Sequence, residues 1–218
     1  MLFVAIAMLL FRSVAVAQIP VEVFAGHKKS TIDIMFFKFI KGKEAPHNPH
    51  WGKFLFFNRN RASVDYAMTK TSNLPQFGFT EAISYNHEKL KGFAPVAVVS
   101  ILNRGIYPKA GIQFAKVNKD YTIFSWVVTE TLKEPNVDFF LLGRYTPKLS
   151  EKLNLFTQME FVNVFPTVNK NIFSFTQRLR LGLKIKEFQF GAGLDFLQLG
   201  RKDFSKTENF GGFVRYEF

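Results

Sequence analysis

The sequence predicts an all-β protein, a closed antiparallel transmembrane β-barrel of ten or twelve strands. Phe occurs 28 times among the 218 residues and aromatic residues make up 17% of the chain, yet the apolar residues are spread over short pieces. Most pieces alternate apolar and polar residues, and several reach the roughly 9 to 11 residues that a tilted strand needs to cross a bilayer. Turn-rich stretches such as HEKLKG, NKD and LKEP separate them.

Residues 1–17 have the composition of a secretory signal peptide. An apolar stretch ends in the sequence AVA, and this small-x-small pattern suits cleavage before Gln18. Two features are atypical, because no Lys or Arg precedes the apolar stretch and Arg12 lies late within it. We expect the mature protein to be exported and basic, since removal of the signal peptide takes only the charge of Arg12 from a formal net charge of +12.

Residues 18–52 have two interpretations. The segments 19–26 (IPVEVFAG) and 30–40 (STIDIMFFKFI) alternate as strands do and would be the first two of twelve. If the barrel has ten strands, residues 18–52 instead cap or plug one of its ends. Twelve strands leave KGKEAPHNPHWGK as an unusually long turn on the side where such turns are generally short.

Residues 53–218 are expected to form the barrel. Its strands should begin near Phe54, Phe77, Phe93, Ile106, Tyr121, Val137, Leu153, Ile172, Phe188 and Glu208. The clearest hairpin is IFSFTQRLRLGLK followed, after three residues, by FQFGAGLDFLQLG, and Gln177 is the one misfit in its first alternation. Because lipid offers backbone groups no hydrogen-bond partner, many strands with hardly any helix indicate a closed barrel without open edges.

The chain ends in the alternating strand FGGFVRYEF, with Tyr216 and Phe218 on its apolar face. The signal peptide, alternating strands, short polar hairpins and terminal aromatic residue resemble Gram-negative outer-membrane β-barrel proteins of a porin-like kind. The GGFVRYEF ending, with abundant Phe, Asn and Lys, is most similar to barrels of Bacteroidota. The resemblance implies an outer-membrane location and contact with lipid and lipopolysaccharide. It also implies that Tyr216 and Phe218 form the insertion signal read by the barrel assembly machinery. We expect no nucleic-acid partner for an exported barrel.

Basic side chains outnumber acidic ones on the faces expected to point inward. The expected lumen-lining basic residues are Arg59, Arg61, Arg144, Arg178, Arg180, Lys184 and Arg215, and the acidic ones are Asp65, Glu160, Asp195 and Glu217. One interpretation is a narrow lumen for anions, because guanidinium stays charged and binds carboxylate or phosphate bidentately. It is similar in outline to narrow channels for acidic oligosaccharides, although no motif of those channels is matched. The other is a cross-strand network of ion pairs that fills a closed lumen.

Catalysis, metals and cofactors find little support in the residues present. The chain has no Cys, which excludes disulfides, thiolate nucleophiles and Cys-ligated metals. His47 and His50 in PHNPHWG have no third ligand nearby, so we expect an exposed loop rather than a metal site. His87 lies at a turn without a matching Ser motif. Trp126 and several Tyr residues are expected to belong to interfacial girdles.

Two functions remain open. The first is a small, narrow porin-like channel with some anion preference and no catalysis. The alternative is a structural or accessory subunit with an occluded lumen that docks onto a larger complex of other outer-membrane proteins. The expected extracellular loops are short, which leaves little material for a pore-constricting loop or a receptor surface and favours the alternative.

Overall fold

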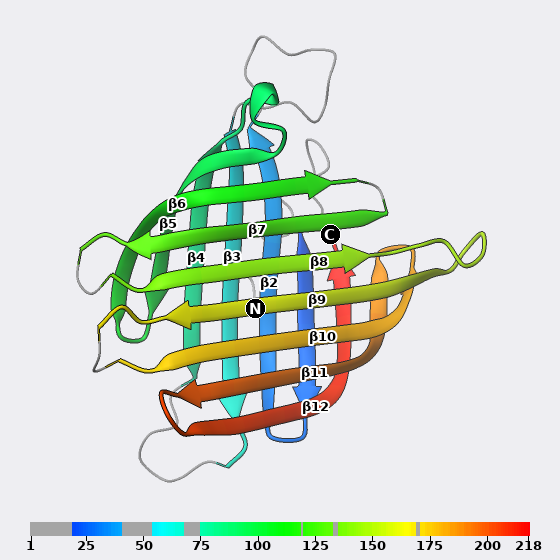
Figure 1. Cartoon of the computed structure of the whole chain (residues 1–218). Coiled ribbons are helices and arrows are strands. Elements are labelled where there is room, and N and C mark those ends of the chain that lie inside the picture. Colours follow the sequence, from blue (N-terminus) through cyan, green and yellow to red (C-terminus); the bar gives the residue numbers. More distant parts are fainter. Residues whose placement is uncertain (1–18, 41–53, 68–74, 119, 133–134, 169–170) are drawn as a thin grey trace, which may run out of the picture.

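The computed structural model describes residues 19–40, 54–67, 75–118, 120–132, 135–168 and 171–218, which form a closed antiparallel barrel of twelve strands (Figure 1). Each strand pairs with its neighbours in sequence, and β1 closes the barrel against β12. The strands are β1 (Pro20–Gly26), β2 (Lys29–Ile40), β3 (Phe54–Asp65), β4 (Gln76–Tyr85), β5 (Phe93–Leu102), β6 (Gly105–Val117), β7 (Tyr121–Glu130), β8 (Val137–Tyr145), β9 (Asn154–Phe165), β10 (Phe173–Ile185), β11 (Phe188–Gly200) and β12 (Phe204–Glu217). The predicted fold class is confirmed, with twelve strands.

Helix is scarce in the part of the chain that the structure describes. It contains one short 3-10 turn, η1 (Glu88–Leu90), between β4 and β5. None of the described residues belongs to a helix long and apolar enough to cross a membrane.

The first two strands complete the barrel. Val21 of β1 pairs with Tyr216 of β12 on one side and with Ile34 of β2 on the other. The interpretation of residues 18–52 as a cap or plug is therefore wrong for β1 and β2, whose backbone hydrogen bonds close the sheet. The expected signal peptide at residues 1–17, and His47 and His50 between β2 and β3, lie outside the described residues.

Strand boundaries agree with the predicted starts to within one residue, except for β12. This strand begins at Phe204 rather than near Glu208, and Phe204 pairs with Gly200 of β11. The early part of β12 was missed because Lys206 and Glu208 occupy the outward face there and hide the apolar alternation.

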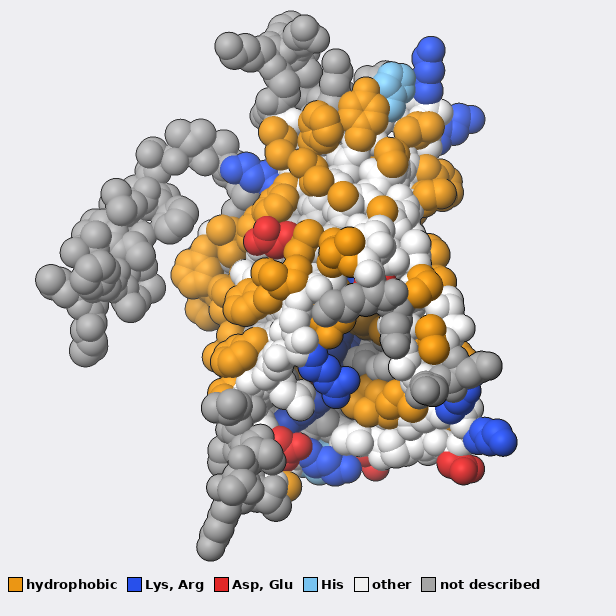
Figure 2. Space-filling model, turned by 90° about the vertical axis from the view of Figure 1, so that its left-hand side faces the viewer, with side chains coloured by type: hydrophobic (Ala, Val, Ile, Leu, Met, Phe, Trp, Pro, Cys, Tyr) orange, Lys and Arg blue, Asp and Glu red, His pale blue; other side chains and the backbone are white. Residues whose placement is uncertain are grey.

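The outer surface of the barrel is apolar. Every strand contributes at least one large exposed apolar side chain: Val23, Ile32, Phe54, Ile83, Val99, Ile112, Val127, Tyr145, Met159, Leu181, Phe190 and Val214. On the face shown in Figure 2, orange apolar side chains spread over the wall, with Lys and Arg side chains mostly towards its ends. A closed barrel with strands of this length and such a surface is built to face lipid, so the strands span a membrane.

The two mouths of the barrel differ in which ends of the chain they carry. β1 begins and β12 ends at what we call the terminal mouth, and the β1–β2 and β11–β12 turns lie at the opposite mouth (Figure 1). Backbone hydrogen bonds of 3.3 and 3.2 Å join Ile19 and Phe218. The Tyr216 ring lies 4.7 Å from the rings of both Phe188 and Phe218. The terminal aromatic residue is thus part of the closing seam of the barrel.

Candidate functional site in the barrel lumen

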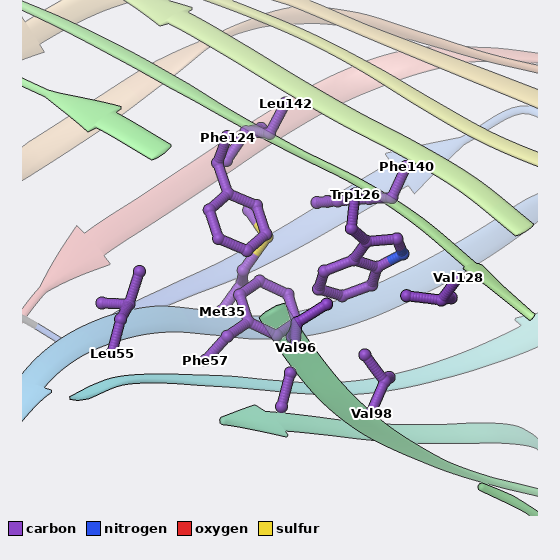
Figure 3. Packing of buried hydrophobic residues seen from close by; sticks show 11 residues of the cluster. Met35, Leu55, Phe57, Val96, Val98, Phe124, Trp126, Val128, Phe140 and Leu142 are labelled. Atoms are coloured by element: carbon purple, nitrogen blue, oxygen red, sulfur yellow. The ribbon is translucent and has the colours of Figure 1, made fainter. Parts of the chain in front are cut away.

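One half of the lumen is filled by apolar side chains. They come from β2 to β5 and from β7 and β8, because alternate residues of these strands are apolar and point inward (Figure 3). The cluster consists of Met35, Leu55, Phe57, Ala82, Val96, Val98, Phe124, Trp126, Val128, Phe140 and Leu142. None is more than 7% exposed, so this half is a packed core and not a passage.

Phe57 makes contacts throughout this apolar cluster. Its ring is stacked on Phe124 with centroids 5.2 Å apart and an angle of 6° between the planes, and it meets Trp126 edge-on at 5.0 Å. Phe140 lies 4.8 Å from Trp126. The prediction that Trp126 belongs to an interfacial girdle is wrong, because the even-numbered residues of β7 face the lumen and Trp126 is one of them.

The other half of the lumen carries most of the charged side chains. In the strand register, Glu160 of β9 lies opposite Arg178 of β10, which lies opposite Asp195 of β11. Arg59 reaches this row from β3, with Nη1 2.8 Å from Glu160 Oε1, and donates from Nε to Asp33 at 3.0 Å. Arg178 donates to the same oxygen of Glu160. Glu160 is 1% exposed, so two guanidinium groups hold a carboxylate that water barely reaches.

Arg180 extends these contacts towards β1. It donates from Nε to Glu22 at 2.9 Å and from Nη1 to Asp195 at 2.8 Å, and its guanidinium lies 4.1 Å from the centre of the Phe24 ring. A Cβ atom at Gly193 would lie only 2.9 Å from Arg180 Cδ and from the Phe24 ring. Glycine at this position therefore gives the arginine the room it occupies.

Arg61 of β3 completes what we call the central network. Its Nη2 lies 3.4 Å from Asp195 and its Nη1 lies 3.8 Å from Asp33. The central network consists of Arg59, Arg61, Arg178, Arg180, Glu22, Asp33, Glu160 and Asp195. Its four positive and four negative groups balance, which is the condition under which so many charges can be buried together.

A terminal basic group lies beside the central network, nearer the terminal mouth. Arg144 and Arg215 both donate to Gln158 Oε1, at 3.0 and 2.9 Å. Lys184 pairs with Glu217, which also lies 4.0 Å from Arg215. This group therefore contains three cations and one carboxylate. Because the central network is balanced, it and the terminal basic group together hold an excess of two basic groups.

Two hollows open at the ends of the polar half. The one at the opposite mouth has a volume of about 260 Å³, and its lining includes Lys29, Thr31, Arg61, Arg178, Asp195 and Asn209. Figure 2 shows a hollow bordered by Lys and Arg side chains. The one at the terminal mouth has about 170 Å³, and its lining includes Asn118, Asp120, Tyr121, Arg144, Lys184 and Glu217.

A layer of side chains separates the two hollows. Glu22 lies opposite Arg215 in the register of β1 and β12, and Gln158 lies opposite Arg180 in that of β9 and β10. Arg180 and Arg215 are 3% and 2% exposed. We call these four residues the separating layer.

The basic residues expected in the lumen all lie in its polar half: Arg59, Arg61, Arg144, Arg178, Arg180, Lys184 and Arg215. Glu160, Asp195 and Glu217 lie there too. Asp65 shares the facing of Arg59 and Arg61 on β3 but lies at the rim of the opposite mouth, where it is exposed and its Oδ1 accepts a hydrogen bond from the Ala67 backbone at 2.9 Å.

Glu22 and Asp33 belong to the central network but were not among the expected lumen residues. A signal for them exists in the sequence, since each is flanked on both sides by β-branched apolar residues in an alternating segment. The signal is ambiguous in the sequence, because a cap or plug formed by residues 18–52 would not place these side chains in the lumen.

No family model matches the chain, and no curated protein matches it. Among solved structures, it is similar to a KdgM porin in complex with disordered oligogalacturonate, with 10% identity, 92% of this chain and 99% of that chain covered, and a TM-score of 0.47. It is also similar to a chain from a study of the in-meso crystallization of membrane proteins, with 9% identity, 93% of this chain and 83% of that chain covered, and a TM-score of 0.49. A third similar structure is a Rhodopseudomonas blastica porin mutant, with 8% identity, 93% of this chain and 99% of that chain covered, and a TM-score of 0.30.

Proposed function

We propose that the protein is a small, narrow porin-like channel of a Gram-negative outer membrane that prefers anions and performs no catalysis. The polar half of the lumen is the passage, and the separating layer is its constriction. The observation that carries this proposal is the pair of hollows at the two ends of one predominantly basic stripe, inside a barrel with an apolar outer surface.

Guanidinium donors that make no hydrogen bond along this stripe favour anions over cations. Arg215 Nε and Nη2, Arg178 Nε and Arg61 Nη1 are buried and have no hydrogen-bond partner among the described residues. Buried donors are normally satisfied, and an anion that passes them can accept their hydrogen bonds. The two excess positive charges of the central network and the terminal basic group add an electrostatic preference of the same sign.

At and near the constriction, an arginine can exchange one hydrogen-bond acceptor for a passing ion and still keep another partner. Arg144 and Arg215 share one oxygen of Gln158, and Arg59 and Arg178 share one oxygen of Glu160. Because a guanidinium has five N–H donors, one contact can be kept while another turns to a passing ion.

Conductance in a planar bilayer tests the proposal. The refolded barrel, with folding shown by heat-modifiable gel migration, should give stable openings whose reversal potential under a KCl gradient reports anion selectivity. Arg144→Gln combined with Lys184→Gln should lower that selectivity, because both cations line the hollow at the terminal mouth. Lys202→Gln, exposed in the β11–β12 turn, is the control and should change it far less. Silence from folded barrels, or equal selectivity of all variants, would contradict the channel.

A second candidate is the structural or accessory subunit with an occluded lumen. The burial of the separating layer supports it, since Arg180 and Arg215 are almost inaccessible to water. Folded barrels that stay silent in the bilayer would favour this candidate, and its partner would then be sought by purification from the outer membrane under mild detergent conditions.

We further propose that Tyr216 and Phe218 act as the insertion signal recognised by the barrel assembly machinery, in a membrane of lipid and lipopolysaccharide. The support is their position: Phe218 is 66% exposed, and its ring packs on Tyr216 at the seam where the barrel closes.

A further inference from the structure

A hydrogen-bonded polar cluster lies on the outer wall of β3 and β4. Asn60 Nδ2 donates to Asn58 Oδ1 at 3.0 Å, and Asn58 Nδ2 donates to Glu81 Oε1 at 3.2 Å. All three side chains point away from the lumen, because the alternate residues Arg59 and Ala82 are buried inside it. Asn58 is only 7% exposed, so Asn60 and Glu81 are the members that face lipid. We call Asn58, Asn60 and Glu81 the outer cluster. Its members lie in the middle of their strands, and therefore well inside the membrane.

The surroundings of the outer cluster are apolar. In the register, Glu81 lies between Asn58 of β3 and Val99 of β5. Phe79 and Ile83 flank it on β4, and both are exposed to lipid, at 43% and 45%. The described part of the chain gives the Glu81 carboxylate the amide of Asn58 and no ion pair. Lipid satisfies neither a carboxylate nor an amide, so polar groups at this depth generally acquire a protein partner.

We propose that the outer cluster is the centre of an interface with a second copy of this chain, related by a two-fold axis along the membrane normal. All copies of an exported barrel insert in the same direction, so their outer clusters lie at the same depth. When the two walls face one another across such an axis, β3 of one copy lies opposite β4 of the other. Asn60 of each copy then approaches Glu81 of the other.

Donors and acceptors in the outer cluster are self-complementary. Within one copy the hydrogen bonds run from Asn60 through Asn58 to Glu81, so Asn60 keeps an N–H and Glu81 keeps its second oxygen for further contacts. Two symmetry-related Asn60–Glu81 hydrogen bonds use both, and the flanking apolar residues exclude lipid around them. The two Glu81 carboxylates also approach each other, and this like-charge contact works against the interface.

Cysteine cross-linking tests this interface directly, because the chain contains no native cysteine. Phe79→Cys places a thiol beside the outer cluster, and Val127→Cys places one on the outward face of β7, where Val127 is 50% exposed. The mature chain is refolded into phosphatidylcholine–phosphatidylethanolamine vesicles at low density and treated with a short bis-maleimide reagent. Phe79→Cys should give covalent dimers and Val127→Cys should not. Equal dimer yields from the two variants would overturn the proposal.

Substitutions within the outer cluster separate a second copy from a different partner. In the Phe79→Cys background, Asn60→Leu with Glu81→Leu should weaken dimerisation about tenfold, because two symmetry-related contacts are lost. Leucine suits a lipid-facing position, so the folded barrel should persist. Glu81→Gln should keep or strengthen the dimer, since the amide can still bond to Asn60 and the carboxylate repulsion disappears.

Two outcomes of these substitutions would overturn the second copy as partner. One is an unchanged dimer yield in the double leucine variant. The other is a loss of dimers in Glu81→Gln as large as in the double variant, which would show that the negative charge itself binds a basic partner. Neither readout depends on conductance, so the interface and the channel can fail independently.

Discussion

Replacing Glu160 with alanine should lower the free energy of unfolding by about 3 kcal/mol, at the lower end of the 3 to 5 kcal/mol typical of breaking a buried ion pair. Glu160 is 1% exposed and accepts hydrogen bonds from Arg59 and Arg178. Its removal leaves both guanidinium groups in the packed polar half. The loss stays near the lower end because Arg59 retains Asp33, and Arg178 retains Asp195 at 3.9 Å.

Urea unfolding in lipid vesicles measures this change, with tryptophan fluorescence as the probe because Trp126 is buried in the lumen. Glu160→Gln preserves the volume and one acceptor and should lose less than Glu160→Ala. Glu151→Ala, exposed in the β8–β9 connection, is the control and should stay within about 0.5 kcal/mol of the parent. If Glu160→Ala is as stable as the control, the central network does not hold the polar half together.

Two further predictions concern the outer wall and the seam. Leu181→Arg should lower the free energy of unfolding by about 2 to 4 kcal/mol in the same urea titration, because Leu181 is 60% exposed to lipid on β10. A stability equal to that of the parent would mean that Leu181 points into the lumen. Deleting Phe218 should reduce the folded fraction in the outer membrane far more than synthesis, since it removes the backbone pairing with Ile19 and a ring contact with Tyr216. Normal insertion of this variant would contradict the role of the terminal aromatic residue.

The barrel could be predicted from the sequence because alternation repeats along the chain and lipid allows few other solutions for strands. Ambiguity arose where the alternation is weak or interrupted. The first two strands are followed by a long polar stretch that suited either a turn or a plug, and the start of β12 carries Lys206 and Glu208 on its outward face. The structure resolves both ambiguities, because β1 and β12 pair with one another to close the barrel.

The lumen could be predicted only in part. Alternation identified Arg178 and Arg180 as inward-facing, but the partner of an inward side chain depends on which strands face each other across the barrel. Arg59 and Glu160 are separated by 101 residues and meet only because β3 and β9 are brought together by the curvature of a twelve-stranded sheet. The outer cluster was missed for a related reason, since Asn58 and Glu81 become neighbours only through the register of β3 and β4.

The most direct test of the account asks which half of the lumen carries ions. Thr207→Cys lies in the lining of the hollow at the opposite mouth, and Val98→Cys lies in the packed apolar half, where Val98 is 2% exposed. Single-channel current is recorded before and after a charged, thiol-specific reagent is added. If ions pass through the polar half, the reagent should reduce the current in Thr207→Cys and leave the current in Val98→Cys unchanged. An unchanged current in modified Thr207→Cys, or a block in Val98→Cys, would contradict it.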